Sequence, residues 1–405
     1  MTETQLKIKS LGHRGDGVAD GPIYVPGALP GETVTGELDG DALRGVKIAV
    51  PSEDRVKPPC AHYKSCGGCG LQHASDTLVE EWKAGVVRRA LAAQDIDAEV
   101  LPVITSPAQS RRRATFAARR TKKAAMAGFH GRASDTIVDI PNCVLIDPAL
   151  RAGLSVASEL AEIGCSRKTT MDVAMTVTEF GLDVAATGGK EMDTALHQEL
   201  ARLSDARDLA RLAWNGEIVL QRMPPRVAFD GIGVELPPAG FLQATAHAQH
   251  TLQQLISDAV AGAAHVVDLF AGCGTFALPL AKHAMVHAVE DNADAIAALD
   301  KGWRNAVGLK RVTHEVRDLF RRPLLPDELR FDAAVIDPPR AGATAQIAEL
   351  AKSDIPTIAH VSCNPQTFAR DAKILLGAGY QLGPVQPIDQ FRWSPHIELF
   401  AVFTK

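Results

Sequence analysis

The residues after about position 240 alternate between short apolar runs and longer segments with helical spacing. Five apolar runs end in polar or glycine residues: HVVDLFAG, MVHAVED, VTHEVRDL, FDAAVIDPP and TIAHVSCNP. The intervening segments 275–284, 291–306 and 367–378 are predicted to be helices. This alternation predicts an α/β fold with a doubly wound parallel sheet, whose ligands bind at the carboxyl ends of the strands. A last apolar run, IELFAVF, is expected to pair at an edge of the sheet.

The N-terminal part of the chain has a different pattern. Residues 5–50 consist of short alternating runs with Gly or Pro at the corners. This pattern predicts a small closed or partly closed β-barrel without a helix. The segment PSEDRVKPPC, which contains three prolines, is expected to be a linker.

A mixed pattern of helices and strands extends from this linker to residue 236. Helices are expected near 76–94, 149–163 and 191–203. Strands are expected near 113–140, 172–186 and 216–228. We therefore predict three domains: a β-barrel over 1–56, a mixed α+β domain over 57–236 and a catalytic α/β domain over 237–405.

Composition and charge argue against several classes of protein. The 405 residues are 46% hydrophobic and 22% charged, as in packed globular domains. A net charge of -5 argues against a protein that binds nucleic acid through its overall charge. The sequence has no apolar run of about 18 residues for a membrane span and no signal-peptide core. Seven cysteines, an odd and low number, argue against a disulfide framework. We expect a cytoplasmic monomer that does not bind a membrane.

The sequence VVDLFAGCGTFALPLA predicts a strand, a glycine turn and a helix that bind a cofactor. Gly272 and Gly274 allow a ligand to approach the backbone closely. Glu290, at the end of the next strand, is placed to bind ribose hydroxyls. Because this loop also satisfies the dinucleotide pattern G-x-G-x-x-A, it leaves both a nicotinamide cofactor and S-adenosylmethionine open.

Residues Asp337, Pro338, Pro339 and Arg340 follow the fourth apolar run and are expected to line the same crevice. Methyltransferases that act on a planar base commonly have an acidic or amide residue before two prolines at this position. A hydride-transfer enzyme has no evident use for such a rigid rim. The motif therefore favours S-adenosylmethionine, although Pro-Pro also ends strands in simple turns.

Cys363 is the candidate nucleophile, and Glu398 is the candidate base. Asn364 is expected to cap a helix that starts at Pro365, and the N-terminus of this helix would lower the pKa of the thiol. A thiolate that adds to carbon 6 of a pyrimidine makes carbon 5 nucleophilic toward a methyl group, and a base must then remove the carbon-5 proton. Glu398 interrupts an apolar strand, where it could instead be an edge charge that discourages aggregation. His396 would share its face.

Four cysteines form a candidate metal site. Cys60, Cys66 and Cys69 lie within ten residues, and Cys143 is the proposed fourth ligand. Their spacing does not distinguish zinc from an iron–sulfur cluster. Cys165 is a rival fourth ligand that we expect in the core instead.

These motifs resemble the RNA 5-methyluridine methyltransferases, most closely those that modify 23S rRNA, over nearly the whole chain. FLQAT, DLFAGCGTF, DPPRAG, SCNPQTFARD and HIEL match the ordered catalytic motifs of that family. VPGALPGE resembles its TRAM domain, an oligonucleotide-binding barrel. CGGCGLQH, with Cys60 and Cys143, is similar to its ligand set for a four-iron, four-sulfur cluster. The resemblance implies S-adenosylmethionine as methyl donor and structured RNA as substrate, with 23S rRNA favoured and tRNA as the alternative.

The resemblance also assigns residues by position, with Cys363 as the nucleophile and Glu398 as the base. The residues that it places around S-adenosylmethionine are Gln243, Phe270, Gly272, Gly274, Thr275, Glu290, Asp318 and Asp337. The sequence departs from the family where Thr245 and Thr275 replace the usual Asn. Both threonines keep hydrogen-bonding capacity, but they change the details of the contacts.

A basic segment, SRRRATFAARRTKK, is the candidate RNA-binding surface. It contains no acid, and its basic residues are Arg111, Arg112, Arg113, Arg119, Arg120, Lys122 and Lys123. Such a run can neutralise phosphates, although a solvated charged hairpin is the alternative. Two other functions stay open: a non-catalytic RNA-binding or assembly factor on a methyltransferase scaffold, and a nicotinamide-dependent oxidoreductase with a cluster. The pair of Cys363 and Glu398 argues against the first of these.

Overall fold

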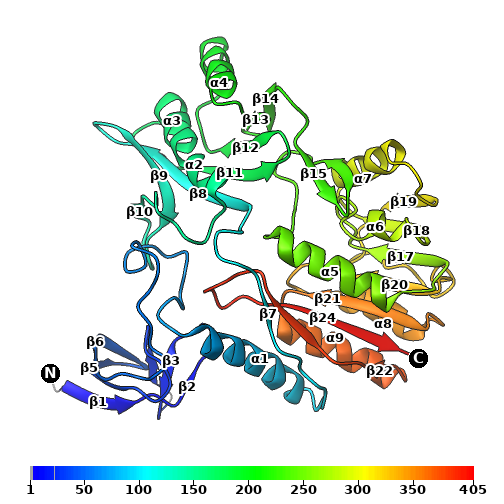
Figure 1. Ribbon diagram of the computed structural model, residues 1–405, viewed down its shortest axis with the longest axis horizontal. Helices are drawn as coiled ribbons and strands as arrows, with labels where there is room; N and C mark the ends of the chain where they lie inside the picture. The colour runs from blue at the N-terminus through cyan, green and yellow to red at the C-terminus, as the bar shows by residue number, and fades with distance from the viewer. Residues whose placement is uncertain (1–2, 22) are drawn as a thin grey trace.

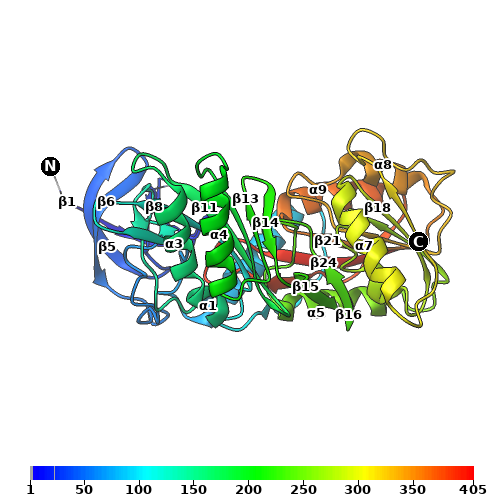
Figure 2. The same cartoon turned by 90° about the horizontal axis from the view of Figure 1, so that it is seen from above.

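The computed structural model describes residues 3–21 and 23–405. The strands of this part of the chain form three large sheets and one two-stranded ribbon. Figure 1 shows the N-terminal sheet in blue, the central sheet in cyan and green, and the C-terminal sheet, with the red strand β24, beside green, yellow and orange helices. Seen from above in Figure 2, the N-terminal and C-terminal sheets lie at opposite ends of an elongated molecule.

The N-terminal sheet has the strand order β1-β5-β6-β4-β3-β2. Its strands are β1 (Glu3–Lys7), β2 (Ser10–Leu11), β3 (Gly17–Ala19), β4 (Ile23–Val25), β5 (Thr33–Asp39) and β6 (Ala42–Val50). Val25 and Val34 are fully buried in its small core. A Cβ atom at Gly36 would lie 2.5 Å from the carbonyl oxygen of Arg44, so glycine is required where β5 crosses β6. The described residues before position 51 contain no helix, as predicted.

The chain joins the C-terminal sheet before it forms the central sheet. Helix α1 (Asp76–Ala92) is capped by Ser75, whose hydroxyl accepts from the Leu78 N–H. Its buried residues Val87 and Leu91 belong to the core of the C-terminal sheet. Strand β7 (Ile104–Thr105) then pairs in parallel with β23 (Gln386–Asp389). The sequence pattern gave no sign of this long-range pairing.

The central sheet has the strand order β10-β9-β8-β11-β12-β13-β14. Its strands are β8 (Arg113–Arg120), β9 (Ala125–His130), β10 (Ile137–Val138), β11 (Met171–Thr178), β12 (Gly181–Thr187), β13 (Arg211–Trp214) and β14 (Glu217–Gln221). The helices beside it are α2 (Pro148–Ala152), α3 (Leu154–Gly164) and α4 (Thr194–Ala206). Phe116 and Trp214 are buried in its core, and so is Cys165, as expected.

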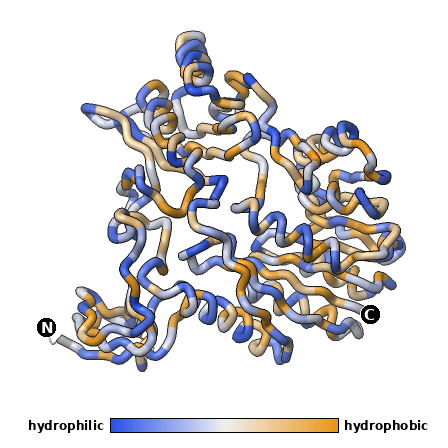
Figure 3. The backbone as a smooth tube through the Cα atoms, viewed as in Figure 1, coloured by the Kyte–Doolittle hydropathy of each residue, from blue (hydrophilic) through white to orange (hydrophobic). Residues whose placement is uncertain are grey.

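The C-terminal sheet contains the predicted parallel strands in the order β19-β18-β17-β20-β21. These strands are β17 (His265–Leu269), β18 (Met285–Glu290), β19 (Val312–Val316), β20 (Ala333–Ile336) and β21 (Thr357–Ser362). A ribbon of β15 (Arg226–Phe229) and β16 (Ile232–Glu235) precedes the sheet. Figure 3 shows hydrophobic residues along these strands. The parallel pairing confirms the predicted α/β fold.

Helices cover both faces of this sheet, as Figure 1 shows. The core on one face includes residues of α5 (Ala246–Ala259), α6 (Ala277–Leu280) and α7 (Ala293–Asn305). The core on the other face includes residues of α1, α8 (Thr344–Lys352) and α9 (Pro365–Gly377). Alternate residues of one strand enter the two cores, Val266 on one side and Val267 on the other. None of the described helices is long and apolar enough to cross a membrane.

The prediction of an edge strand near the C-terminus is wrong. Strand β24 (Glu398–Thr404) pairs antiparallel with β21 on one side. On its other side it pairs with β22 (Gln381–Leu382) and β23. The pattern of one segment cannot show that strands from other parts of the chain will cover it. Burial on both sides makes a carboxylate in β24 more costly than it would be at an edge.

Candidate active site

One cavity of about 670 Å³ opens at the carboxyl ends of the parallel strands. Residues that follow β17, β18, β20 and β21 line it, together with a segment before α5 and residues near the start of β24. The strand order reverses between β17 and β20, which is where a doubly wound sheet binds its ligand. The cavity is therefore where the sequence pattern predicts it.

The glycine turn after β17 is fixed by Glu290. Gly272 has a φ of 53° and Gly274 a φ of 90°, both in the left-handed region that favours glycine. The N–H of Gly272 donates to Glu290 Oε2 at 3.0 Å. Glu290 Oε1 accepts from the Asn292 N–H, also at 3.0 Å. Glu290 thus joins the turn to the end of β18 and faces the cavity, where a ribose could bind.

The structure brings most of the predicted cofactor residues together. Those that line the cavity are Gln243, Phe270, Gly272, Thr275, Glu290 and Asp337. Gly274 is not among them, because it shapes the turn behind the cavity against Leu278. Asp318 does not line it either: its carboxylate accepts the N–H groups of Phe320 and Arg321. Phe320 itself faces the cavity and packs on Phe270 with ring centroids 5.5 Å apart.

Thr245 and Thr275, which stand where the family usually has Asn, have different surroundings. The hydroxyl of Thr245 caps α5 by accepting from the Ala248 N–H at 3.0 Å, and it also contacts the hydroxyl of Ser106. Thr245 is therefore a helix cap outside the cavity. Thr275 lines the cavity, and its carbonyl accepts from the side chain of Gln253 at 2.8 Å.

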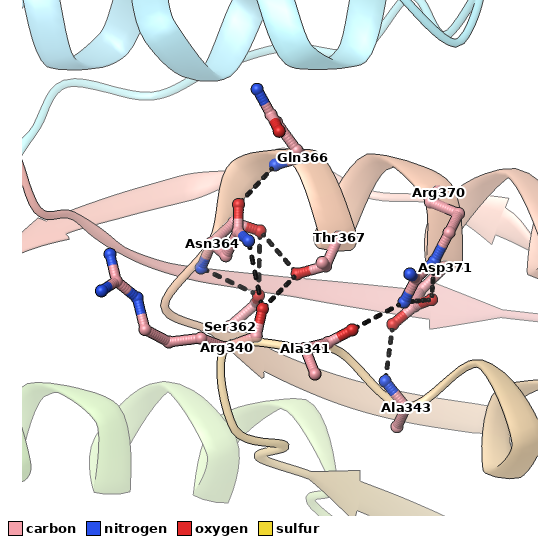
Figure 4. Close-up of polar contacts among 9 residues, drawn as sticks. All are labelled: Arg340, Ala341, Ala343, Ser362, Asn364, Gln366, Thr367, Arg370 and Asp371. Carbon is pink, nitrogen blue, oxygen red and sulfur yellow. Dashed lines mark hydrogen bonds and ion pairs between the residues drawn. The ribbon is translucent and has the colours of Figure 1, made fainter. Parts of the chain in front are cut away.

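The loop that carries Cys363 is joined to the loop after β20 (Figure 4). As predicted, Asn364 caps α9, since its Oδ1 accepts from the Gln366 N–H at 3.0 Å. Its Nδ2 donates to the carbonyl oxygen of Arg340 at 3.1 Å. Further along α9, the Arg370 guanidinium donates to the Ala341 carbonyl at 3.1 Å. These bonds hold the thiol of Cys363 beside the Pro-Pro rim.

The predicted lowering of the Cys363 pKa is wrong. Burial raises the pKa of this thiol to about 11, and the nearby carboxyls of Glu398 and Asp337 raise it further. The positive charge of Arg340 acts in the opposite direction but does not compensate. The helix N-terminus is a weaker influence than burial beside two carboxyls, which only the folded structure brings there.

Glu398 begins β24 and is only 4% exposed. Burial, together with the neighbouring Asp337, raises its pKa to about 8. Burial also raises the pKa of Asp337 to about 7. Two carboxyls and a thiol thus share one cavity, and carboxyls with pKa values near neutrality are suited to accept and release protons. His396 lies before β24, where its Nδ1 contacts the Arg340 guanidinium at 3.0 Å.

Two side chains that line or support the site were missed by reasoning from the sequence. Gln390 lines the cavity, and its Nε2 donates to Glu398 Oε2 at 2.8 Å. Lys83 of α1 is buried, and its Nζ lies 2.7 Å from Asp389 and donates to the His396 carbonyl at 2.9 Å. Lys83 had a detectable signal, because it lies on the apolar face of α1 beside Trp82 and Val87. Gln390 had none.

The basic segment divides into two parts, and the first does not form an exposed phosphate-binding run. Arg111, Arg112 and Arg113 are half-buried where the central region meets the residues before α5. The guanidinium of Arg112 donates to Gln249 Oε1 at 2.7 Å and to the Gln243 carbonyl at 3.3 Å. Arg111 and Arg113 line the cavity. These three arginines therefore do not form an exposed run, and their role in RNA binding stays a prediction.

The second part of the basic segment forms the exposed end of the hairpin of β8 and β9. Its basic residues are Arg119, Arg120, Lys122 and Lys123, and no described carboxylate pairs with any of them. Phe116, which could have stacked on a base, is fully buried and packs against Phe129. The hairpin therefore presents charge without an aromatic surface at this position.

The four predicted metal-ligating cysteines come together in the structure. Cys66, Cys69 and Cys143 are buried in one cluster, and the Cys60 thiol is partly exposed. Burial raises the pKa of Cys69 to about 12, and the other three thiols are near enough to raise it further. Among the described residues, however, no group of three or more His, Cys, Asp or Glu side chains is arranged so that it could hold a metal ion.

Comparison with known proteins gives matches over the whole chain. The family model described as tRNA (Uracil-5-)-methyltransferase matches residues 232–405. An uncharacterized RNA methyltransferase of Brucella suis is 44% identical over 405 residues, which cover 99% of this chain and 98% of the relative. The 23S rRNA (uracil(1939)-C(5))-methyltransferase RlmD of Shewanella piezotolerans is 30% identical, with coverage of 99% and 96%.

A solved structure has the same overall arrangement. The tRNA (uracil-54, C5)-methyltransferase of Pyrococcus abyssi, solved in complex with S-adenosyl-L-homocysteine, superimposes with a TM-score of 0.78. It is 25% identical in sequence, and the match covers 99% of each chain.

Proposed function

The chain belongs to the family of S-adenosylmethionine-dependent RNA uracil-5-methyltransferases. We propose that it methylates carbon 5 of one uridine in a structured RNA. The observation that carries the proposal is the placement of Cys363 and Glu398. They come from neighbouring antiparallel strands, and both side chains line the cavity with Asp337. A nucleophile and a base in one crevice are what the reaction at carbon 5 requires.

The proposed reaction begins when Cys363 loses its thiol proton, which its raised pKa makes infrequent near neutral pH, and the resulting thiolate adds to carbon 6 of the uracil ring. The new carbon–sulfur bond makes carbon 5 nucleophilic. S-adenosylmethionine, bound in the cavity, would supply the methyl group and leave as S-adenosylhomocysteine. Glu398 then accepts the proton from carbon 5, and the electron pair of that bond expels the Cys363 thiolate. The uridine must leave its stack to enter the cavity, because carbon 5 is not accessible to both groups within a helix.

Tritium release tests this reaction. Incubation of the protein with S-adenosylmethionine and RNA tritiated at carbon 5 of uridine should release tritium and form a covalent RNA–protein adduct. Cys363→Ser should form no adduct and should lower release more than about 1000-fold, as for loss of a catalytic nucleophile. Release that survives in Cys363→Ser would remove this residue from the mechanism. A wild-type protein that releases no tritium from any rRNA or tRNA would favour the RNA-binding factor.

We propose 23S rRNA as the substrate, and tRNA is the second candidate. The similarity to RlmD at 30% identity favours rRNA. The whole-chain similarity to a tRNA-modifying enzyme, at 25% identity and a TM-score of 0.78, keeps tRNA open. Tritium release from separate pools of unmodified rRNA and tRNA distinguishes the two, since only one pool should react at low enzyme concentration.

We propose that the N-terminal sheet is an oligonucleotide-binding TRAM domain and that the β8–β9 hairpin binds phosphates. The exposed and unpaired charges of the hairpin support the second part. Lys122→Ala with Lys123→Ala should weaken RNA binding and flatten its salt dependence by about 1 to 2 in log–log slope. Arg88→Ala with Arg89→Ala, which removes two exposed charges from α1, is the matched control. Equal slopes for the two double variants would make the hairpin an ordinary solvated surface.

We propose that Cys60, Cys66, Cys69 and Cys143 hold a four-iron, four-sulfur cluster. The proximity of four thiols, three of them buried, supports this proposal. A cluster distributes its ligands over the corners of a cube, so they need not converge on one point as ligands of zinc do. Anaerobic purification should give a brown protein with iron and acid-labile sulfide that Cys143→Ala lacks. A colourless protein with one zinc would contradict the proposal.

A further inference from the structure

Gln390 connects the two ends of the catalytic cavity through hydrogen bonds. It is 3% exposed and lies between Gln243, which is 2% exposed, and Glu398, which is 4% exposed. Its Nε2 donates to Gln243 Oε1 at 2.7 Å and to Glu398 Oε2 at 2.8 Å. Gln243 Nε2 continues the chain to Asp337 Oδ2 at 3.4 Å. A single amide therefore contacts both the candidate base and the residue beside the second carboxyl.

The orientation of this amide is fixed by the backbone. The N–H of Ala244 donates to Gln390 Oε1 at 2.8 Å. Because a backbone N–H can only donate, Gln390 must present its oxygen to Ala244 and its NH₂ group to the other two partners. Gln243 must then accept through its oxygen, so its own NH₂ group faces Asp337. The donor and the acceptor are therefore fixed for each hydrogen bond of this network, and an amide NH₂ group donates to each of the two carboxyls.

This arrangement uses one oxygen of Glu398 and leaves the other for the substrate. Gln390 occupies Oε2, and no described side chain or backbone N–H donates to Oε1. Glu398 is nevertheless in contact with the cavity, so Oε1 is the atom available to accept a proton from carbon 5. A carboxylate without a fixed partner could rotate and present either oxygen in several positions.

We propose that Gln390 is a positioning residue, which holds Glu398 in its proton-accepting orientation and links it through Gln243 to the cofactor side of the cavity. This inference rests on the proposed function, because it assigns Gln390 a role in the reaction of Glu398. The amide also favours the ionised base, since its N–H bond to Oε2 lowers the pKa that burial and Asp337 raise.

Gln390→Met itself changes none of the charged or titratable groups near Glu398. Those that line the cavity with it are Asp337, Arg340, Cys363, His396, Arg111 and Arg113. The ion pair of Asp389 in the adjacent β23 and Lys83 in α1 lies behind them. Gln390→Met keeps the size of the side chain and removes all its hydrogen bonds. Gln390→Glu keeps an oxygen for the Ala244 N–H but places a second acceptor against Glu398. Gln386→Met is the matched control, because Gln386 is a buried glutamine of β23 that bonds only to carbonyl oxygens, away from the cavity.

The first measurement is the pH dependence of tritium release from a covalent adduct formed beforehand, so that ionisation of the Cys363 thiol does not contribute. Release requires ionised Glu398, so its rate rises with pH through the pKa of that group. Gln390→Met should move this rise to higher pH by about one to two units, the size expected for the loss of a hydrogen bond to a charged group. At pH 7.5 its release should therefore fall about ten- to 100-fold, and the covalent adduct should accumulate. Gln390→Glu should shift the rise further, and Gln386→Met should leave its position unchanged.

The second measurement does not depend on activity. Infrared difference spectra should contain a carbonyl band of protonated Glu398, assigned by its absence in Glu398→Gln, and Gln390→Met should retain this band to higher pH. A band and a pH profile equal to those of the wild type would overturn the inference, even if the variant is less stable. If the wild type modifies no RNA while the band still shifts, the proposed function fails and the positioning of Glu398 stands.

Discussion

Cys363, the proposed nucleophile, and Glu398, the proposed base, are held in different ways. The loop of Cys363 is fixed by hydrogen bonds between the residues that follow β20 and those that begin α9, all within residues 340–371. Glu398 is fixed by Gln390, which depends on Ala244 and Gln243, and the segment before Glu398 is held by Lys83. The position of Cys363 is thus determined within two neighbouring motifs, whereas that of Glu398 depends on two distant parts of the chain, residues 243–244 and Lys83.

The segment that leads to Glu398 has a further long-range anchor. The carbonyl oxygen of Trp393 accepts the N–H groups of Gly70 and Leu71 at 2.8 and 3.0 Å, directly after the cysteine-rich loop. The Trp393 ring is buried in the same cluster as Cys66 and Cys69. Disturbance of the N-terminal half should therefore affect the base before it affects the nucleophile.

The largest effect that tests this difference is expected from Lys83→Met. The variant leaves Asp389 buried without its partner, which should lower the free energy of unfolding by about 3–5 kcal/mol. Because the bonds around Cys363 are untouched, the variant should still form the covalent adduct but release little tritium. Urea unfolding and rapid-quench measurement of the adduct check both effects.

An exposed pair on the same helix is the control for Lys83→Met. Arg88→Met breaks the ion pair with Glu81, in which the Arg88 side chain is 48% exposed and the Glu81 side chain 68% exposed. It should lower the free energy of unfolding by at most about 1 kcal/mol. A loss below about 1 kcal/mol for Lys83→Met, or equal loss of adduct formation and release, would show that the base is not held separately from the nucleophile.

The pH dependence of the reaction distinguishes Glu398 from Cys363, because the two groups ionise at different pH. The pKa of Glu398 is raised to about 8, whereas that of Cys363 is raised to about 11. The base must be ionised to accept a proton, so release from an adduct formed beforehand should increase about tenfold per pH unit up to pH 8 and then become constant. A pH jump after adduct formation measures this step without the thiol. A rate that does not change between pH 6 and 8 would contradict Glu398 as the base.

The smallest effect is expected on the nucleophile side, from Asn364→Ala. Loss of this helix cap should lower the free energy of unfolding by about 1 kcal/mol. Because Asn364 also holds the Arg340 carbonyl, tritium release should fall several-fold, with less adduct formed. Asp193→Ala removes a comparable cap from α4 in the central region and should cost similar stability without a loss of activity. Equal activity of the two variants would show that the Asn364 cap has no effect on Cys363.

Much of the C-terminal half could be predicted because its interactions are periodic or local. Apolar runs that alternate with helical segments specify a parallel sheet, and the residues after each strand must then meet at one edge. Glu290, Asp337 and Cys363 were placed in the cavity by this rule alone. Asn364 was predicted to cap α9 because a cap depends only on its neighbours along the chain.

The errors concern properties that depend on distant residues. The pKa of Cys363 is raised because Glu398 and Asp337 are folded against it. Arg112 is half-buried because Gln243 and Gln249 lie beside it, which its basic neighbours in the sequence could not reveal. Likewise, β24 is covered on both sides because β21 pairs with one edge and β22 and β23 with the other.

The sequence by itself determined the class of fold, the family and the residue types that carry the chemistry. It did so because strand and helix periods, glycine turns and short motifs express interactions between near neighbours. Only the tertiary structure decided which groups share the cavity with them. It also decided that Gln390 bonds to Glu398, that Lys83 bonds to the segment before it, and that burial raises the pKa values of Glu398 and Cys363. Electrostatic energies and buried hydrogen bonds depend on distance in space and on exclusion of water, and neither is encoded by separation along the chain.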